Sequence, residues 1–148
     1  MSVIPLQHDR LVLDTSVIVK WFRQGEILAK PALVLRDAYL NGQAAIAAPS
    51  LLIYELTNVL RYKSDLSVYQ VQQAAESLFE MDLLIVPPTA SVMQLAVDIA
   101  RTYDITIYDA AFVALAQTLP AAFVTADERL SKRLVAFSFV YFLGEVPV

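Results

Sequence analysis

Short apolar runs alternate with longer helical stretches along almost the whole chain, and this alternation restricts the possible folds more than any other feature. The runs predicted as strands are residues 10–14, 44–48, 83–86, 121–125 and 137–143. The stretches predicted as helices are residues 15–22, 26–42, 51–63, 67–81, 89–103, 107–119 and 127–134. Regular hairpin signals are missing between the runs, so we expect parallel strands covered by helices on both faces. The predicted fold is therefore α/β, a three-layer α/β/α sandwich around a central, mostly parallel sheet.

The chain is predicted to form a single domain over residues 1–148, since no repeat, low-complexity tract or linker divides it. Apolar residues make up 57% of the sequence, which indicates a large core or an apolar surface that meets a partner. The longest uncharged run, residues 110–126, is interrupted by Gln117 and Pro120 and is short for a membrane span. The first residues lack the basic leader and sustained apolar segment of a signal peptide, so we expect a cytoplasmic protein.

The sequence lacks most of the side chains on which familiar catalytic sites depend. It has no cysteine, three glycines and a single histidine, His8. A thiolate zinc site, a histidine-rich metal site and glycine-rich nucleotide loops are therefore excluded, and a Ser-His-Asp triad would have to use His8. Carboxylates and hydroxyls remain as catalytic groups. Carboxylates without thiols or imidazoles select hard cations such as Mg²⁺ or Mn²⁺.

Two carboxylates lie at the ends of predicted strands. Asp14 ends the first run, and Asp127 follows the run 121–125. Because ligands of open α/β sheets bind beyond the carboxyl ends of the strands, both positions favour a functional site. Each residue could instead cap the helix that follows it.

Two further carboxylates lie on predicted helices. Glu55 borders the apolar stripe of helix 51–63, where it can turn inward over the sheet edge or point to solvent. Asp109 stands at the head of the apolar stretch IYDAAFVALA, where Thr106 and Asp109 also match a T-x-x-D capping box.

Bringing such carboxylates together is costly without a cation. Two of them ~5 Å apart repel by about 3 kcal/mol at an effective dielectric constant of roughly 20. A divalent cation would neutralise them, lower the pKa of a bound water and orient a phosphate oxygen. These properties suit the hydrolysis of phosphodiesters.

Four segments resemble the PIN-domain family, and most of all its VapC-type toxins of toxin–antitoxin pairs: LVLDTSVIVKWF, LLIYELTNVLRYK, IYDAAFVALA and FVTADERLSKRL. They occur in the family's order across nearly the whole chain. By position, the resemblance implies an acidic quartet that is both catalytic and metal-binding, around Mg²⁺ or Mn²⁺: Asp14, Glu55, Asp109 and Asp127. It also implies that Ser16 and Thr125 supply accompanying hydroxyls, and it implies an α/β/α sandwich with a central parallel sheet.

The resemblance further implies a metal-dependent endoribonuclease. In this activity, metal-activated water hydrolyses an RNA phosphodiester and leaves 5′-phosphate and 3′-hydroxyl ends. The implied partners are an RNA substrate, a small cognate antitoxin protein and a second copy of the chain in a homodimer.

An RNA substrate would have to bind a chain whose net charge is −4. Local basic residues are the candidate RNA contacts: Lys20, Arg23, Arg61, Lys63, Arg129, Lys132 and Arg133. They can equally belong to solvated helix faces. Trp21 and Tyr54 could stack on bases, although aromatic residues at helical spacing more often belong to a core.

Two other classes of protein stay open. A receiver-like phospho-acceptor domain also places acids at strand ends, but Asp9 is far from Asp14 along an extended strand and no lysine follows the run 137–143. A catalytically silent PIN-like interaction module would keep the core and lose the acids, whereas all four acidic positions are present. Stabilisation by Mn²⁺ would separate a metal site from a bare interaction module.

Overall fold

The computed structural model describes residues 8–23 and 25–148, and its strands form one parallel sheet. The strand order is β3-β2-β1-β4-β5, and every neighbouring pair is parallel. The strands are β1 (Arg10–Leu13), β2 (Ala45–Pro49), β3 (Leu84–Val86), β4 (Ala122–Thr125) and β5 (Val140–Phe142). The prediction of a parallel sheet is confirmed. The last strand is shorter than the predicted run 137–143, because residues 138–139 form a turn and a 3₁₀ turn begins at Leu143.

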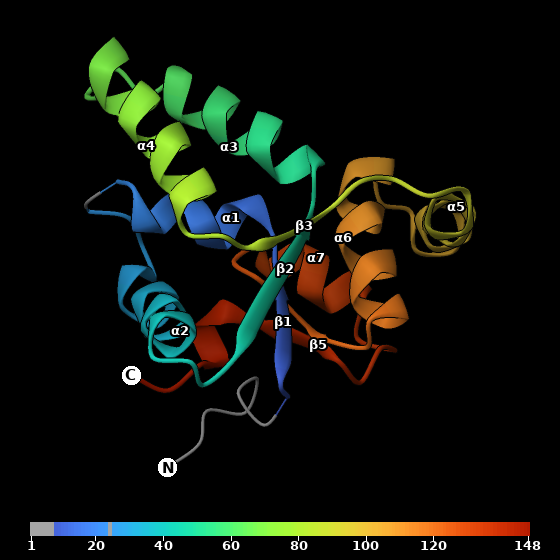
Figure 1. Ribbon diagram of the computed structural model, residues 1–148. Coiled ribbons are helices and arrows are strands. Elements are labelled where there is room, and N and C mark those ends of the chain that lie inside the picture. The colour runs from blue at the N-terminus through green and yellow to red at the C-terminus, as the bar shows by residue number, and fades with distance from the viewer. Residues whose placement is uncertain (1–7, 24) are drawn as a thin grey trace.

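Helices connect the strands and cover both faces of the sheet, which confirms the predicted three-layer sandwich. Figure 1 shows α2 and α6 on opposite sides of the sheet, while α3 and α4 lie side by side beyond the carboxyl end of β2. The helices are α1 (Thr15–Ile18), α2 (Ala29–Leu40), α3 (Leu51–Arg61), α4 (Val68–Glu80), α5 (Ala90–Tyr103), α6 (Ile107–Thr118) and α7 (Glu128–Arg133), with 3₁₀ turns η2 (Val19–Trp21) and η3 (Leu143–Glu145).

Two predicted helices differ from the observed ones. The predicted helix 15–22 is one α-helical turn, α1, that continues as the 3₁₀ turn η2. The predicted helix 26–42 begins later, at Ala29, because Leu28 adopts a left-handed backbone conformation with φ of 63°. A residue in that conformation cannot continue a right-handed helix.

Helix α6 explains the long uncharged run of the sequence. It packs against β1, β2 and β4 on one side and against α5 on the other. Its buried residues are therefore found all round the helix: Ala110, Phe112, Val113, Ala114, Leu115 and Ala116. Within the described part of the chain, no helix is both long enough and apolar enough to cross a membrane.

The order of the strands reverses between β1 and β4. From β1 the chain adds β2 and β3 on one side, and then it adds β4 and β5 on the other side. The chain connections that leave β1 and β4 therefore diverge. Ligands of open parallel sheets bind where two such connections diverge, at the carboxyl ends of the strands. Asp14 directly follows β1 and Asp127 comes two residues after the end of β4, so both predicted site residues lie at this point.

Candidate active site

Asp14 is the most buried carboxylate of the acidic quartet, with only 6% of the residue exposed to solvent. Its Oδ1 accepts a hydrogen bond from the Ser16 hydroxyl. Burial raises the pKa of Asp14 to about 6, although hydrogen bonds from Ser16 and Thr125 oppose the rise. The side chain makes no capping hydrogen bond to α1, all of whose residues the structure describes. The backbone N–H of Val17 in α1 still lowers the pKa of Asp14, so the carboxylate faces the start of this helix without forming a regular cap.

The hydroxyls of Ser16 and Thr125 link the ends of β1 and β4. Ser16 Oγ lies 3.5 Å from Thr125 Oγ1 and accepts a hydrogen bond of 2.9 Å from the backbone N–H of Ala126. Thr125, which is fully buried, accepts a hydrogen bond of 3.0 Å from the backbone N–H of Asp127. Both predicted hydroxyls thus lie between Asp14 and the loop that carries Asp127.

Glu55 turns toward the strand ends and is half-buried. Its Oε1 accepts a hydrogen bond of 2.8 Å from the hydroxyl of Thr15. Burial raises the pKa of Glu55, the Thr15 hydroxyl opposes this rise, and the charge of Asp109 adds to it. Thr15 was not among the predicted site residues, and its place between Asp14 and Ser16 was the signal available for it.

Asp109, in the first turn of α6, is also half-buried, and it interacts electrostatically with the other acids. The charge of Asp109 raises the pKa of Asp14 and of Glu55. The pKa of Asp109 is raised by burial first and by the charge of Asp127 second. The acidic quartet is therefore coupled through this one carboxylate.

The capping box predicted at Asp109 is only half formed. The hydroxyl of Thr106 caps α6 by accepting a hydrogen bond of 3.1 Å from the backbone N–H of Asp109. The reciprocal bond, from the backbone N–H of Thr106 to the carboxylate, is not found among the hydrogen bonds of the described residues. The cap uses the Asp109 backbone, while a side-chain hydrogen bond from Thr106 lowers the pKa of the carboxylate.

Asp127 does cap a helix, as its alternative interpretation predicted. Its Oδ1 accepts a hydrogen bond of 3.1 Å from the backbone N–H of Leu130 at the start of α7. The residue is exposed, and one of its carboxylate oxygens is occupied by the cap. A carboxylate has a second oxygen, so capping and ion binding are compatible.

Two cavities contain three of the four acids of the quartet. One, of about 550 Å³, lies between α6 and α7 and contains Asp109 and Asp127. The other, of about 340 Å³, lies between α1 and α3 and contains Thr15, Ser16 and Glu55. Asp14 lines neither cavity, so a molecule in either cavity would meet the neighbours of Asp14 first.

The donor set fits a hard divalent cation, because it consists of carboxylates whose charges raise one another's pKa and of hydroxyl oxygens beside them. Yet among residues 8–23 and 25–148 no three acidic or histidine side chains converge closely enough to hold one ion. The structure therefore brings the quartet into one neighbourhood without forming a closed coordination shell.

Basic residues on η2 and the loop that follows it are already paired within the protein. Lys20 and Arg23 both form ion pairs with Glu26, and Arg23 also pairs with Asp65 at 3.2 Å. An RNA phosphate would have to compete with these carboxylates.

Three other predicted RNA contacts are not paired with a carboxylate of the described residues. The guanidinium of Arg61 lies over the ring of Tyr62, 4.4 Å from its centroid. Lys63 and Arg129 form no ion pair with any residue that the structure describes.

The two aromatic residues considered for base stacking differ in exposure. Trp21 is half-buried and donates a hydrogen bond of 2.9 Å from Nε1 to the carbonyl of Ala32, so it packs at the edge of the core. Tyr54 is 78% exposed and remains available to a partner.

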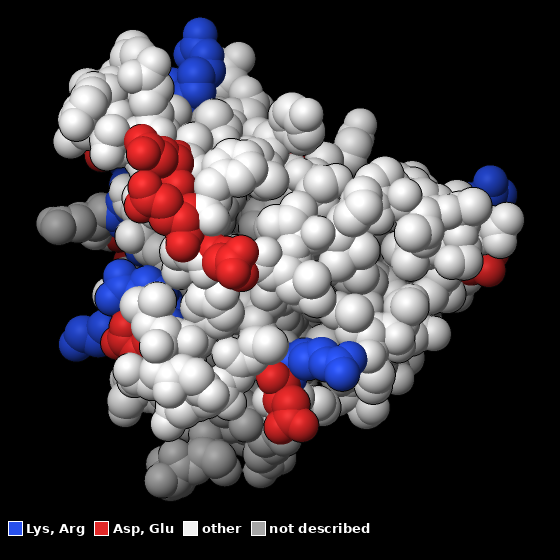
Figure 2. Space-filling view, in the orientation of Figure 1, with Lys and Arg blue, Asp and Glu red and all other residues white. Residues whose placement is uncertain are grey.

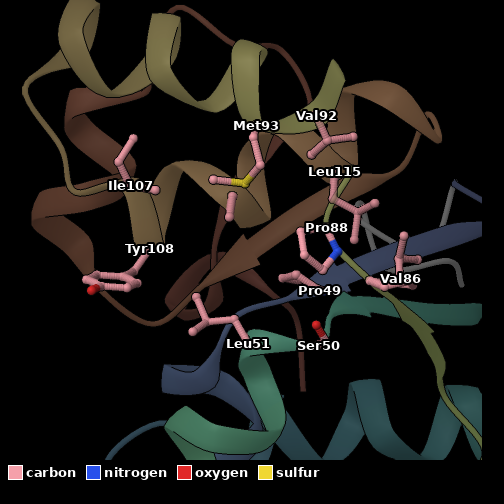
Figure 3. A pocket seen from close by; sticks show the side chains of 12 residues that line it. Pro49, Ser50, Leu51, Val86, Pro88, Val92, Met93, Ile107, Tyr108 and Leu115 are labelled. Atoms are coloured by element: carbon pink, nitrogen blue, oxygen red, sulfur yellow. The ribbon is translucent and has the colours of Figure 1, made fainter. Parts of the chain in front are cut away.

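A third cavity, of about 200 Å³, is apolar, and Ile107 and Tyr108 in its wall directly precede Asp109 in the sequence (Figure 3). Side chains from the ends of β2 and β3, from the start of α3 and from α5 and α6 surround it, among them Leu51, Met93, Tyr108 and Leu115. Figure 2 shows the face of the molecule that carries the β3–α5 connection, and no charged side chain covers the area between α3 and α5. This area is suited to contact with another protein rather than with an anion.

The profile of the PIN domain family matches residues 11–134 of the chain. No curated protein matches the chain. The match to this family decides against the receiver-like alternative.

Solved structures of distant relatives share the fold. The structure of PAE2754 from Pyrobaculum aerophilum is 15% identical, with 91% of this chain and 84% of that chain covered and a TM-score of 0.66. A toxin–antitoxin complex from Klebsiella pneumoniae gives 16% identity, 90% and 97% coverage and a TM-score of 0.66. VapC20 of Mycobacterium tuberculosis, described as a toxin that cleaves the sarcin–ricin loop, gives 14% identity, 82% and 93% coverage and a TM-score of 0.65. With the sequence match over most of its length and the same fold, the chain belongs to the PIN domain family.

Proposed function

We propose that this chain is a metal-dependent endoribonuclease and the toxin of a VapBC-type toxin–antitoxin pair. The observation that carries the proposal is the placement of four carboxylates, from four separate segments, in one neighbourhood at the carboxyl edge of the sheet, where electrostatic interactions link Asp109 to the other three. Membership of the PIN domain family supports a nuclease. The printed descriptions of two solved neighbours, a loop-cleaving toxin and a toxin–antitoxin complex, support the toxin role.

The acidic quartet would hold Mg²⁺ or Mn²⁺, which lowers the pKa of water and polarises a phosphate oxygen when bound. The protein's own hydroxyls orient two of the four acids: Ser16 donates to Asp14 and Thr15 donates to Glu55. Burial of Asp14 keeps bulk water away from it, which strengthens its interaction with a positive charge. In the reaction, a water oxygen adds to phosphorus while the bond to the 3′ oxygen breaks, which leaves a 5′-phosphate and a 3′-hydroxyl.

Cleavage of RNA should depend on a divalent ion and on the quartet. We expect the purified protein to cut total RNA with Mg²⁺ or Mn²⁺ and to lose this activity in a chelator. Asp14→Ala should lower the rate at least about a hundredfold, the scale of removing one electrostatic group from an active site. The measurement is gel analysis of the RNA with mapping of the cut ends.

The control for this experiment is Asp98→Ala, which removes an exposed carboxylate from α5 and should leave cleavage unchanged. Cleavage that persists in the chelator, or equal cleavage by Asp14→Ala, would contradict the proposal. An absence of cleavage together with an unchanged melting temperature in Mn²⁺ would favour the silent interaction module.

Asp109→Asn separates a metal ligand from a helix cap. If Asp109 belongs to an unneutralised acidic cluster, the variant in chelator should be as stable as wild type or more stable, because one of several like charges is gone. Mn²⁺ should then stabilise wild type much more than the variant. Thermal unfolding with and without Mn²⁺ measures both effects.

Thr106→Ala is the matched control, because Thr106 supplies the cap hydroxyl of α6. It should lower the free energy of unfolding by about 1 kcal/mol and leave the response to Mn²⁺ intact. If Asp109→Asn loses stability in chelator and keeps its response to Mn²⁺, Asp109 serves the helix terminus alone.

Stability in chelator should depend on pH through Asp14. Its folded pKa of about 6 lies above the unfolded value of 3.8, so the folded form binds the proton more tightly and stability falls as pH rises between these values. The difference amounts to about 3 kcal/mol at about 1.4 kcal/mol per pKa unit. The stability of Asp14→Asn relative to wild type should therefore rise by up to this amount between about pH 4 and about pH 8.

Urea unfolding at the two pH values measures this change. If the difference in stability between Asp14→Asn and wild type is the same at both pH values, Asp14 is not desolvated as its buried position indicates.

The proposed partners are a small antitoxin protein and a second copy of this chain. The apolar cavity beside α6 would receive an apolar side chain, and its surroundings carry no charge that would repel an acidic second copy. An acidic site also suits a basic side chain of an inhibitor, which can take the place of the metal's charge.

Co-expression with the neighbouring open reading frame should yield a stable complex without nuclease activity. Light scattering should show two copies of this chain in the purified protein. If the chain does not slow growth and no neighbour co-purifies, the toxin role is wrong even where the nuclease activity stands.

A further inference from the structure

The cavity between α6 and α7 holds charges of both signs. Asp109 and Asp127 of the acidic quartet line it, and so do Arg129 and Arg133 of α7. Two guanidinium groups beside two proposed metal ligands need an explanation, because carboxylates and arginines in one cavity normally pair with each other.

Only one of the two arginines is engaged. Arg133 donates to the backbone carbonyl and to the carboxylate of Asp104, which ties α7 to the end of α5. Arg129 makes no hydrogen bond or ion pair with a residue in the described ranges, and it is exposed. The nearest acid in sequence that lines the cavity, Asp127, already accepts the backbone N–H of Leu130.

The other basic residues considered for RNA binding are paired with an acid or lie outside the two cavities that contain the acids. Lys20 and Arg23 are held by Glu26, and Lys132 pairs with Glu128 across one turn of α7. These residues, like Arg61 and Lys63, line neither of the two acidic cavities. Of the described basic residues considered for RNA binding, Arg129 is therefore the one that lines a cavity with the acids and has no partner within the protein.

We propose that Arg129 binds the RNA phosphate next to the bond that is cut, an inference that rests on the proposed nuclease function. A guanidinium can donate two parallel hydrogen bonds to a phosphate, which fixes the orientation of the strand as well as its charge. Such a contact is needed here because the chain carries a net charge of −4 and the quartet repels phosphates. Arg129 thus positions the strand, while the quartet performs the chemistry.

Binding of a short single-stranded RNA to the full chain with Mg²⁺ tests the proposal, in an Asp14→Ala background that leaves the RNA intact. Arg129→Ala should weaken binding about tenfold, the scale of one charge-assisted contact. It should also reduce the slope of log affinity against log salt by about 0.7 to 1, the value for one phosphate contact. Arg129→Lys should recover the salt slope and only part of the affinity, because it restores the charge without the planar pair of donors.

Arg36→Ala is the matched control, since it removes the same charged group from α2, whose residues line neither acidic cavity. Unchanged affinity and salt slope in Arg129→Ala, or equal losses in Arg36→Ala, would overturn the assignment.

Cleavage kinetics in the otherwise unchanged chain give a second test, in which Arg129→Ala should raise KM more than it lowers kcat. A fall in kcat at unchanged KM would overturn the binding role. If the wild-type chain neither binds nor cuts RNA, the proposed function itself fails. If it cuts RNA and Arg129→Ala behaves as wild type, only this inference fails.

Discussion

The parallel pairing of β1 with β4 positions the candidate site. In this pairing Leu13 lies opposite Val124, and the backbone N–H of Asp14 continues the ladder by donating to the carbonyl of Val124 at 3.3 Å. Asp14 and Thr125 therefore leave the sheet side by side, and Ser16 reaches both of them. Because helices cover both faces of these central strands, a carboxylate at this point is removed from water, which is the main cause of its raised pKa.

The fold tolerates the acidic quartet because each acid has a nearby hydrogen-bond donor, which for Asp109 is the Thr106 hydroxyl that lowers its pKa. Ser16 donates to Asp14, Thr15 donates to Glu55, and the N–H of Leu130 donates to Asp127. These bonds offset part of the cost of burial, and the mutual repulsion remains. In a partly desolvated site the repulsion is converted into affinity for a cation, since binding an ion removes it. The proposed affinity for a cation should be most sensitive to substitution of Asp109, which interacts with the other three acids.

Much of the fold and part of the site could be predicted from sequence. The predicted strand ends indicated Asp14 and Asp127 as site residues. The alternation of apolar runs with helical stretches predicted the parallel sheet. The orientation of Glu55 could not be predicted, because a residue at the border of an apolar stripe can face either way and the Thr15 hydroxyl decides it. The start of α2 was missed because nothing in the sequence marks the left-handed conformation of Leu28.

Pairing between distant charges was also beyond sequence analysis. Arg23 and Asp65 are 42 residues apart and meet only through the packing of η2 near the end of α3, so a basic residue predicted for RNA is already engaged. Similarly, sequence could assign Asp109 to a capping box, but whether the box closes depends on a single hydrogen bond that the structure does not form among its described residues.

The first turn of α6 places two cavities of opposite chemistry next to each other. Ile107 and Tyr108 line the apolar cavity, while Asp109 lines the polar one. This follows from helix geometry, because consecutive residues point about 100° apart and neighbours along the chain face different surroundings. The same turn is capped by Thr106, so any movement of the turn shifts all of these side chains together. A protein partner that fills the apolar cavity therefore touches the helical turn that carries Asp109. Such a partner could alter the acidic quartet without contacting Arg129, the residue proposed to bind RNA, which does not line the apolar cavity.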